Sequence, residues 1–253
     1  MAALNGKHAL VTGGGRGIGR AIAAVLAGAG AAVTVLGRDE AALRATVEAG
    51  DASGYVRADV TDEAAVKSAI ENATEMRGPV NILIANAGGA EPARFNRAEA
   101  AQFRRMFELN VMSVVHSVRA VLDGMVASAF GRIVVIASTA GLKGYPTMPA
   151  YVAAKHAAVG LVRALALDVV ATGVTVNAVC PTFTDTDLIS RGMESTAART
   201  GGTRDDALAA LLKDKPLGRL VRPEEVAEAV LFLCSANASA VTGTTIAVAG
   251  GEV

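Results

Sequence analysis

The sequence predicts an α/β fold in which helices cover both faces of a parallel sheet of about seven strands. Short apolar runs, typical of buried strands, alternate with helical segments along the chain of 253 residues. The predicted strands are 8–12, 32–36, 55–58, 80–85, 132–137, 174–179 and 245–248. Alternation of this kind indicates a Rossmann-type, doubly wound sheet, whose ligands bind beyond the carboxyl ends of the strands.

The pattern is continuous, which favours one domain over residues 1–253 rather than two small ones. The exception is the stretch 187–218, which contains Gly192, Gly201, Gly202 and several charges. We expect this stretch to form a helical insertion with a mobile tip.

The charge balance excludes some classes of partner. Basic and acidic residues number 24 each, so no basic field is available to hold nucleic acid.

The most apolar long stretch, 157–171, is interrupted by Arg163 and Asp168 and is too short to span a bilayer. The first residues lack the pattern of a secretory signal. We expect a cytoplasmic protein with no membrane association, whose partners are small molecules or copies of itself.

The cysteines and histidines indicate neither a disulfide framework nor a metal site. Cys180 and Cys234 lie in apolar segments, and Cys180 is interpreted as a small buried side chain. His8, His116 and His156 have no partner at the spacing of metal ligands.

The most informative feature is the pair Tyr151 and Lys155, with Ser138 upstream just after the predicted strand 132–137. A spacing of four on a helix places the phenol and the ammonium on one face, so the lysine charge favours the phenolate. A tyrosine whose pKa is lowered in this way can exchange a proton near neutral pH. The alternative is a core aromatic residue beside a lysine that reaches solvent, because this spacing recurs on ordinary helices.

A glycine-rich loop follows the predicted strand 8–12 and precedes a helix. Its spacing is Gly13-x-x-x-Gly17-x-Gly19, which differs from the Gly-x-Gly-x-x-Gly pattern of many dinucleotide-binding folds. Glycines let backbone N–H groups approach a pyrophosphate closely, because no Cβ blocks the way. A merely flexible turn is the alternative, and the flanking strand and helix argue against it.

Taken in order, these motifs resemble the short-chain dehydrogenase/reductase family over essentially the whole chain. The matching residues are Thr12, Gly13, Gly17, Gly19, Asp59, Val60, Asn86, Ala87, Gly88, Asn110, Ser138, Tyr151 and Lys155. The resemblance implies an NAD(P)-dependent oxidoreductase that interconverts a secondary alcohol and a ketone. It also implies that 187–218 is a substrate lid and that the chain forms a homotetramer.

The resemblance implies four catalytic residues. Tyr151 would be the general acid for carbonyl reduction and the base for alcohol oxidation, and Ser138 would hydrogen-bond the same substrate oxygen. Lys155 would lower the pKa of the tyrosine and hold the nicotinamide ribose. Asn110 would position a water that connects Lys155 to solvent, unless it simply bonds to a neighbouring strand's backbone.

The implied cofactor site draws on the loops at one edge of the sheet. It comprises Gly13, Gly15, Arg16, Gly17, Ile18, Gly19, Arg38, Asp59, Val60, Asn86, Ala87, Gly88, Tyr151, Lys155, Pro181, Thr184 and Thr186. The alternatives are a helix cap with a core valine for Asp59 and Val60, and a tight turn for 86–88. Thr182 departs from the family's usual Gly, and Ala249 from its more frequent Asp.

The end of the second predicted strand favours NADP over NAD. An NAD site places a carboxylate there for the ribose hydroxyls, whereas a cationic side chain suits the extra phosphate of NADP. Here the strand-end residue is Gly37 and the next is Arg38, and Arg16 in the glycine loop could reach the same phosphate. Asp39 is interpreted as an exposed carboxylate at a helix start. If Asp39 turned toward the ribose instead, it would favour NAD.

Substrate identity is left open. The residues 138–144, 151–156 and 176–181 are similar to reductases of 3-oxoacyl thioesters and polyketides, and also to dehydrogenases of simple secondary alcohols. We expect a mainly apolar pocket that suits a ketone, a secondary alcohol or an acyl-CoA. Its predicted lining is Ala90, Ala140, Leu142, Tyr145, Met148 and the lid.

The substrate we expect first is a 3-hydroxyacyl or 3-oxoacyl thioester or a related ketone, and there are two alternatives. One is a catabolic, NAD-dependent dehydrogenase of a cyclic or aryl secondary alcohol. The other is a non-catalytic, cofactor-binding interaction protein, against which the intact set of Ser138, Tyr151 and Lys155 argues.

Overall fold

The computed structural model describes residues 3–253, apart from the side chains at 188 and 200. Its centre is a seven-stranded sheet with the order β3-β2-β1-β4-β5-β6-β7, in which all neighbouring strands are parallel. The strands are β1 (His8–Thr12), β2 (Ala32–Gly37), β3 (Gly54–Arg57), β4 (Val80–Ala85), β5 (Gly131–Ile136), β6 (Val174–Pro181) and β7 (Thr245–Val248). All the predicted strands are confirmed. β6 extends past its predicted end because Cys180 and Pro181 pair with Ala247 and Val248 of β7.

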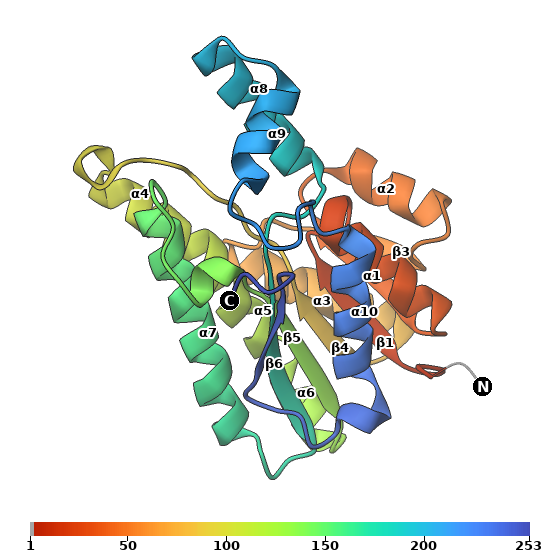
Figure 1. Ribbon diagram of the computed structural model, residues 1–253. Coiled ribbons are helices and arrows are strands. Elements are labelled where there is room, and N and C mark those ends of the chain that lie inside the picture. The colour runs from red at the N-terminus through yellow and green to blue at the C-terminus, as the bar shows by residue number, and fades with distance from the viewer. Residues whose placement is uncertain (1–2) are drawn as a thin grey trace.

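Helices alternate with the strands along the chain and cover both faces of the sheet (Figure 1). They are α1 (Gly17–Gly28), α2 (Glu40–Glu48), α3 (Glu63–Arg77), α4 (Ala100–Phe107), α5 (Ser113–Arg119), α6 (Leu122–Ala127), α7 (Pro149–Asp168), α8 (Asp187–Thr200), α9 (Arg204–Leu212) and α10 (Pro223–Cys234). Shorter turns are η1 (Phe95–Arg97), the π-helical η2 (Glu108–Met112), η3 (Thr139–Gly141) and η4 (Ala236–Ala238). The predicted Rossmann-type, doubly wound fold is therefore confirmed.

Alternate residues of each strand pack on opposite faces. In β1, Leu10 belongs to the core that includes residues of α3, α5 and α7, whereas Ala9 and Val11 belong to the core that includes residues of α1 and α10. All three are fully buried. Burial on both faces explains why the strands read as continuous apolar runs rather than as an alternating pattern.

The strand order reverses between β1 and β4. In a doubly wound sheet this reversal opens a crevice at the carboxyl ends of the strands. The loops after β1, β4, β5 and β6 meet at this edge, and they carry the predicted site residues at 13–17, 86–88, 138 and 184–186.

The stretch 187–218 is helical, as predicted, and contains two helices. α8 and α9 pack against each other and project from the carboxyl edge of the sheet (Figure 1). Gly201 follows α8 with a φ of 73°, a left-handed conformation that favours glycine. Thr203 then caps α9, because its Oγ1 accepts from the Asp206 N–H at 3.1 Å while the Asp206 carboxylate accepts from the Thr203 N–H at 2.8 Å.

Among the described residues, α7 is the one helix long and apolar enough to cross a membrane by length and composition alone. A core helix passes the same test, so this single helix is weak evidence for a span. One face of α7 packs in the core through Val159, Val162 and Ala166. Ala150 and Ala154 are buried in a second cluster with Met106 of α4, whereas Leu167 near the end of α7 is 75% exposed.

Candidate active site

The glycine loop joins β1 to α1 at the carboxyl edge of the sheet. Gly13 and Gly17 have φ angles of 66° and 51°, which glycine adopts without strain. A Cβ on Gly19 would lie 2.3 Å from the carbonyl oxygen of Gly13, so the first turn of α1 closes tightly on the loop. Arg16, the N-cap residue of α1, makes no side-chain cap, which leaves the first N–H groups of the helix for an anion. A pyrophosphate fits this cradle.

The other loop residues contact neighbouring elements. A Cβ on Gly15 would lie 3.2 Å from Ala42 of α2, and Ile18 packs against the core that includes α1. A Cβ on Gly17 would lie 3.2 Å from Cγ2 of Thr186, the N-cap residue of α8. The start of the predicted lid therefore lies directly against the glycine loop.

Thr12 and Asn86 fasten the end of β1 to the segment after β4. Thr12 Oγ1 accepts from the N–H groups of Asn86 and Ala87, both at 3.0 Å. Asn86 Nδ2 donates to the carbonyl oxygens of Thr12, at 2.9 Å, and Gly13, at 3.3 Å. Thr12 was not among the predicted site residues, although a hydroxyl at the end of an apolar strand was a signal for it.

Asn110 lies in the π-helical turn η2 and holds the continuation of the same segment. Its Nδ2 donates to the carbonyl oxygens of Gly89 and Met106, both at 3.0 Å, and its Oδ1 accepts from the Gly89 N–H at 3.3 Å. A Cβ on Gly88 would lie 2.8 Å from Asn110 Oδ1 and 3.5 Å from Lys155 Nζ. Asn110 thus bonds to backbone, but of the segment after β4 and of α4 rather than of a strand, in the immediate surroundings of Lys155.

The structure brings Ser138, Tyr151 and Lys155 together. Lys155 Nζ lies 5.7 Å from the centroid of the Tyr151 ring and donates to the carbonyl oxygen of Ile136, the last residue of β5, at 2.9 Å. Two residues further on, the Ser138 hydroxyl hydrogen-bonds to Tyr151 and accepts from the Ala140 N–H at 3.0 Å. A hydroxyl, a phenol and a buried ammonium therefore converge at the end of β5.

The pKa of Tyr151 has the opposite direction to the one expected from the sequence. Burial raises it above 10.0, and the hydrogen bond from Ser138 offsets this only in part. Burial also lowers the pKa of Lys155 to about 8. The Lys155 ammonium donates to the carbonyl oxygen of Ile136 rather than to the phenol. The desolvation of the Tyr151 phenol therefore outweighs the attraction of the ammonium for a phenolate.

Two arginine–carboxylate pairs lie near the end of β2. Asp39 is the N-cap residue of α2, as predicted, and its Oδ1 accepts from the Ala42 N–H at 3.2 Å. Its other oxygen pairs with Arg16. Arg38 reaches Asp59 at 3.5 Å and keeps 74% of its side chain exposed. The carboxylate of Asp39 is thus already in contact with one of the two arginines expected to hold a phosphate.

Asp59 and Val60 follow β3. The cap of α3 is Asp62, so the helix-cap alternative for Asp59 is wrong. Asp59 Oδ1 instead accepts from the N–H of Thr61 at 3.0 Å and from its hydroxyl at 2.8 Å. Val60 is buried, and its carbonyl oxygen accepts from His116 Nδ1 at 3.1 Å.

The segment after β6 carries Pro181, Thr184 and Thr186. Pro181 ends the strand, and the buried Thr184 donates to the carbonyl oxygen of Thr182 at 2.9 Å. Thr186 donates to the carbonyl oxygen of Thr184 at 3.3 Å. These turns carry the chain from the sheet edge past the glycine loop into α8. Cys180, just before them, is fully buried and free, which confirms its interpretation as a small core side chain.

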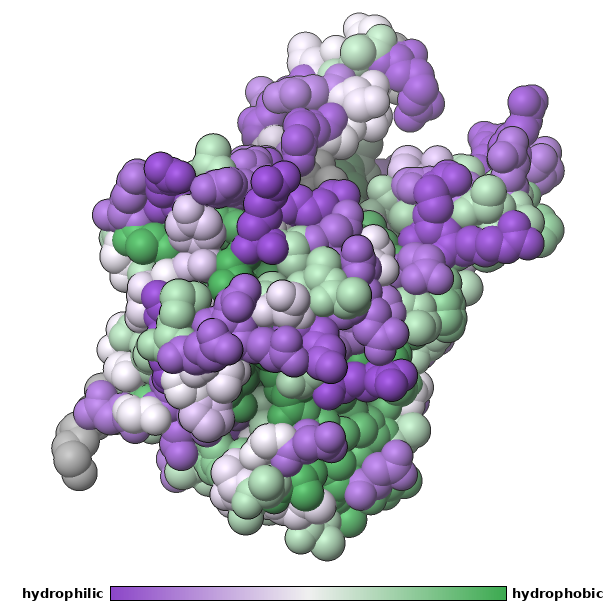
Figure 2. Space-filling model, turned by 180° about the vertical axis from the view of Figure 1, so that it is seen from behind, coloured by the Kyte–Doolittle hydropathy of each residue, from purple (hydrophilic) through white to green (hydrophobic). Residues whose placement is uncertain are grey.

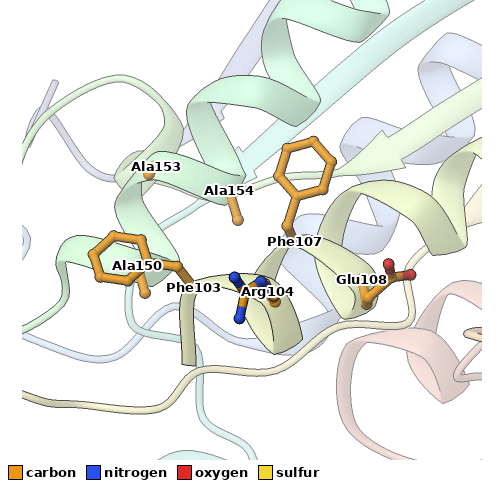
Figure 3. A pocket seen from close by; sticks show the side chains of 7 residues that line it. All are labelled: Phe103, Arg104, Phe107, Glu108, Ala150, Ala153 and Ala154. Carbon is orange, nitrogen blue, oxygen red and sulfur yellow. The ribbon is translucent and has the colours of Figure 1, made fainter. Parts of the chain in front are cut away.

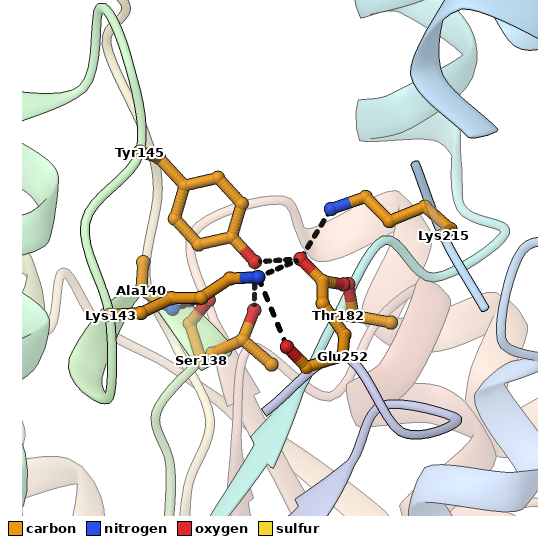
Figure 4. Close-up of polar contacts among 8 residues, drawn as sticks. Ser138, Ala140, Lys143, Tyr145, Thr182, Lys215 and Glu252 are labelled. Carbon is orange, nitrogen blue, oxygen red and sulfur yellow. Dashed lines mark hydrogen bonds and ion pairs between the residues drawn. The ribbon is translucent and has the colours of Figure 1, made fainter. Parts of the chain in front are cut away.

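Glu252 is a residue near this site that the sequence analysis missed. It is the only charged residue in the stretch 229–253, which was the available signal. Its carboxylate accepts hydrogen bonds from Tyr145, Lys215 and Thr182 (Figure 4). Of the predicted pocket lining, Tyr145 belongs to this cluster, whereas Ala140 is only 3% exposed and offers little surface to a ligand.

A separate hollow lies between α4 and α7 (Figure 3). Its lining residues are Phe103, Arg104, Phe107, Glu108, Ala150, Ala153 and Ala154. The lining includes none of Ser138, Tyr151 and Lys155, so we do not assign it to the chemistry. Within residues 3–253, no group of three or more His, Cys, Asp or Glu side chains is placed to hold a metal ion.

Comparison with known proteins places this site in a family. The short chain dehydrogenase family model matches residues 7–196. The chain is 40% identical over 250 residues to cis-4-hydroxycyclohexanecarboxylate dehydrogenase of Sinomonas cyclohexanicum, covering 97% of this chain and 96% of the relative. It is 37% identical to 3-oxoacyl-[acyl-carrier-protein] reductase FabG of Escherichia coli K12, covering 97% of each.

Solved structures agree with these relatives. A single-residue variant of actinorhodin polyketide ketoreductase, solved with NADPH, superposes with a TM-score of 0.93 and 35% identity over 99% of this chain and 98% of the other. Levodione reductase also gives a TM-score of 0.93, at 29% identity and 98% coverage of both chains. The matched residues, the relatives and the seven-stranded fold together show that this chain belongs to the short-chain dehydrogenase family and is an NAD(P)-dependent oxidoreductase that interconverts a secondary alcohol and a ketone.

Proposed function

We propose that the chain is an NADP-dependent reductase of a 3-oxoacyl thioester or a related ketone. The observation that supports this most is the convergence of Ser138, Tyr151 and Lys155 beside a glycine cradle at one edge of the sheet. The relatives include 3-oxoacyl-[acyl-carrier-protein] reductases and a polyketide ketoreductase.

In this proposal the chain's own residues handle the proton. Tyr151 donates its phenolic proton to the substrate oxygen during reduction and takes it back during oxidation, while Ser138 hydrogen-bonds the same oxygen. Lys155 attracts the phenolate as it forms, and its position next to Gly88 suits contact with a ribose. Asn110 keeps the segment 86–89 in place and positions a water that leads from Lys155 to solvent. When bound, the nicotinamide supplies or accepts the hydride.

We infer NADP rather than NAD from Arg16 and Arg38. Arg38 is largely exposed and only loosely paired with Asp59, so it is available to a phosphate at the end of β2. Arg16 is available once it leaves Asp39. The remaining proposed contacts are the glycine loop residues Gly13, Gly15, Gly17, Ile18 and Gly19, with Asp59, Val60, Asn86, Ala87, Gly88, Pro181, Thr184 and Thr186.

A specific observation favours a second candidate. The relative at 40% identity is named for a hydroxycyclohexanecarboxylate, so a cyclic secondary alcohol oxidised with NAD is the alternative substrate class. If Asp39 turned from Arg16 toward a ribose, it would suit that cofactor.

The working unit in this proposal is one domain over 1–253 whose stretch 187–218 covers the substrate. We infer a cytoplasmic homotetramer. Hydrophobic residues gather low on the side of the molecule that carries α5 and α7 (Figure 2). The hollow between α4 and α7 lies at the opposite, N-terminal end of α7 and adds a further apolar surface. Helices of this kind would pack against a second copy.

The test is the consumption of NADPH and, separately, of NADH, with acetoacetyl-CoA, a 4-oxocyclohexanecarboxylate and an aryl ketone. We expect faster consumption of NADPH with the thioester. Faster consumption of NADH with the cyclic keto acid would favour the second candidate. Absence of turnover with all three, despite bound cofactor, would overturn both proposed substrate classes.

A further inference from the structure

The carboxylate of Glu252 joins the C-terminal tail to three segments that are far apart in the sequence (Figure 4). Its side chain is only 3% exposed. One oxygen accepts from Lys143 at 2.9 Å, from Lys215 and from the Tyr145 hydroxyl, and the other accepts from the Thr182 hydroxyl. Two ammonium groups and two hydroxyls therefore surround one buried carboxylate.

The backbone conformation of the C-terminal tail, residues 249–253, places this carboxylate among its partners. Gly250 has a φ of 56°, and a Cβ there would lie 2.5 Å from Cβ of Leu217. Gly251 has a φ of 85° and runs beside Pro216. Only glycine combines these angles with so close an approach. The tail is thus packed on the end of the stretch 187–218, two residues from Lys215.

On the substrate side, the cluster leads to Ser138. The Tyr145 hydroxyl donates to Glu252 and accepts from the Thr139 hydroxyl at 2.6 Å. Thr139 is the direct neighbour of Ser138 and begins the turn η3. Movement of the Glu252 carboxylate would therefore release the segment that sets the position of the Ser138 hydroxyl.

On the cofactor side, the cluster leads to the loop after β6. Thr182 stands where the family usually has Gly, and its hydroxyl is bonded to Glu252. Its N–H donates to the carbonyl oxygen of Val248 at 3.2 Å, which places this loop against the same tail. A glycine at this position would have no hydroxyl. The Thr182 hydroxyl therefore gives Glu252 a hydrogen-bond donor that the usual residue cannot provide.

Glu252 is ionised throughout the range in which enzymes work. Burial alone would raise its pKa, but hydrogen bonds from Lys215, Thr182, Tyr145 and Lys143 outweigh burial and lower it to about 2. Burial and the hydrogen bond to Glu252 raise the pKa of Tyr145 to about 12, so its hydroxyl remains a donor.

We propose that Glu252 is a positioning residue for the active site, which ties the end of the 187–218 stretch to the segment after Ser138 and to the loop after β6. With Glu252 in place, these three segments form one wall of the substrate pocket. The kinetic part of this inference rests on the proposed function, whereas the structural part does not.

The test compares Glu252→Gln with Glu228→Gln, which makes the same change on the exposed surface of α10. Loss of a buried, charge-assisted contact should raise KM for the ketone about ten-fold, while the Kd of the cofactor stays within about two-fold. Hydrogen exchange of the amides in 204–218 should become faster in Glu252→Gln and stay unchanged in Glu228→Gln. Thr182→Val should reproduce part of the rise in KM. Thr182→Ser keeps the hydroxyl and should therefore have a KM near that of the wild type.

Two results would overturn this role. One is a Glu252→Gln variant that matches Glu228→Gln in both KM and exchange. The other is an equal loss of substrate and cofactor binding together with a large fall in Tm, which would mean general destabilisation. If the wild-type protein reduced no ketone, the proposed function would fail, and the exchange comparison would still decide whether Glu252 holds the 187–218 stretch.

Discussion

Tyr151 and Lys155 lie one turn apart on α7, but they do not form a direct hydrogen bond. The ammonium is held by the carbonyl oxygen of Ile136 at the end of β5, and the phenol is hydrogen-bonded by Ser138. Burial keeps the phenol protonated and brings the pKa of the ammonium down to about 8. A proton donor beside a lysine close to its titration point suits reversible proton exchange.

Replacing Tyr151 by Phe removes the proposed proton donor with little change in shape. Turnover should fall by roughly 10²- to 10⁴-fold, the range typical of positioned proton transfer. Binding of NADPH, followed by its fluorescence, should remain near the wild-type level. Near-normal turnover would refute the assignment of Tyr151.

The cofactor preference can be tested with Asp39→Asn. Asparagine caps a helix as well as aspartate does, so α2 should persist, while Arg16 loses its ion-pair partner. We expect NADPH to bind about two- to five-fold more tightly, the scale of an exposed ion pair. The measurement is calorimetric titration with NADPH and NADH.

Glu48→Gln, at the far end of α2, makes the same charge change and serves as the control. The opposite result, weaker NADH binding with unchanged NADPH binding, would show that Asp39 holds the ribose and that the chain uses NAD.

At the scale of elements, buried polar side chains fasten β1 to its neighbours. His8 in β1 contacts the Gly78 carbonyl oxygen through Nδ1 at 2.8 Å and Thr34 Oγ1 of β2 through Nε2 at 2.9 Å. A neutral ring with its proton on Nδ1 satisfies both contacts, with the Thr34 hydroxyl as donor to Nε2. At the other end of β1, Thr12 and Asn86 make the corresponding brace to β4.

The brace at His8 predicts a pH dependence of stability. Burial lowers the pKa of His8 below 6.5 in the folded state. Above a pH of about 6.5 the ring is neutral in both the folded and the unfolded state. As the pH falls below this value, the unfolded chain takes up a proton first. The free energy of unfolding therefore decreases until the pH passes the pKa of the folded state.

The loss from this one group is at most about 1.4 kcal/mol for each pH unit. Urea unfolding of wild type and His8→Gln, at fixed protein concentration, should show a difference in stability that shrinks as the pH is lowered from 6.5. A difference independent of pH would contradict the buried neutral ring.

At the scale of the whole molecule, α4 and α7 present an apolar surface outside the core. Phe107 is 44% exposed at the hollow between these helices, and Leu167 is 75% exposed on α7. Exposed apolar side chains at both ends of one helix are typical of a surface that binds another protein surface. The proposed homotetramer would cover it.

Phe107→Glu would place a charge in that surface. We expect the mass in sedimentation to fall from that of the tetramer to that of a smaller species, because an unpaired carboxylate would be buried at the contact. Met76→Glu on α3, where the methionine is 56% exposed, should leave the mass unchanged. If both variants kept the wild-type mass, α4 would not take part in assembly.

The sequence by itself determined the positions of the strands, the glycine loop and the helical pairing of Tyr151 with Lys155. These features depend on neighbours within one turn or one strand, so periodicity and spacing suffice to predict them. The same holds for the helical character of 187–218, where Gly201 follows the end of α8 and Thr203 precedes the start of α9.

Only the tertiary structure decided which partners the charged groups take. Tyr145 and Glu252 are 107 residues apart, and Arg16 and Asp39 are 23 apart, so no local pattern reveals either contact. The direction of the Tyr151 pKa likewise depends on how deeply the folded chain buries the phenol. Such contacts arise when loops from different strands meet at one edge of the sheet, and their energies depend on the burial that this meeting creates.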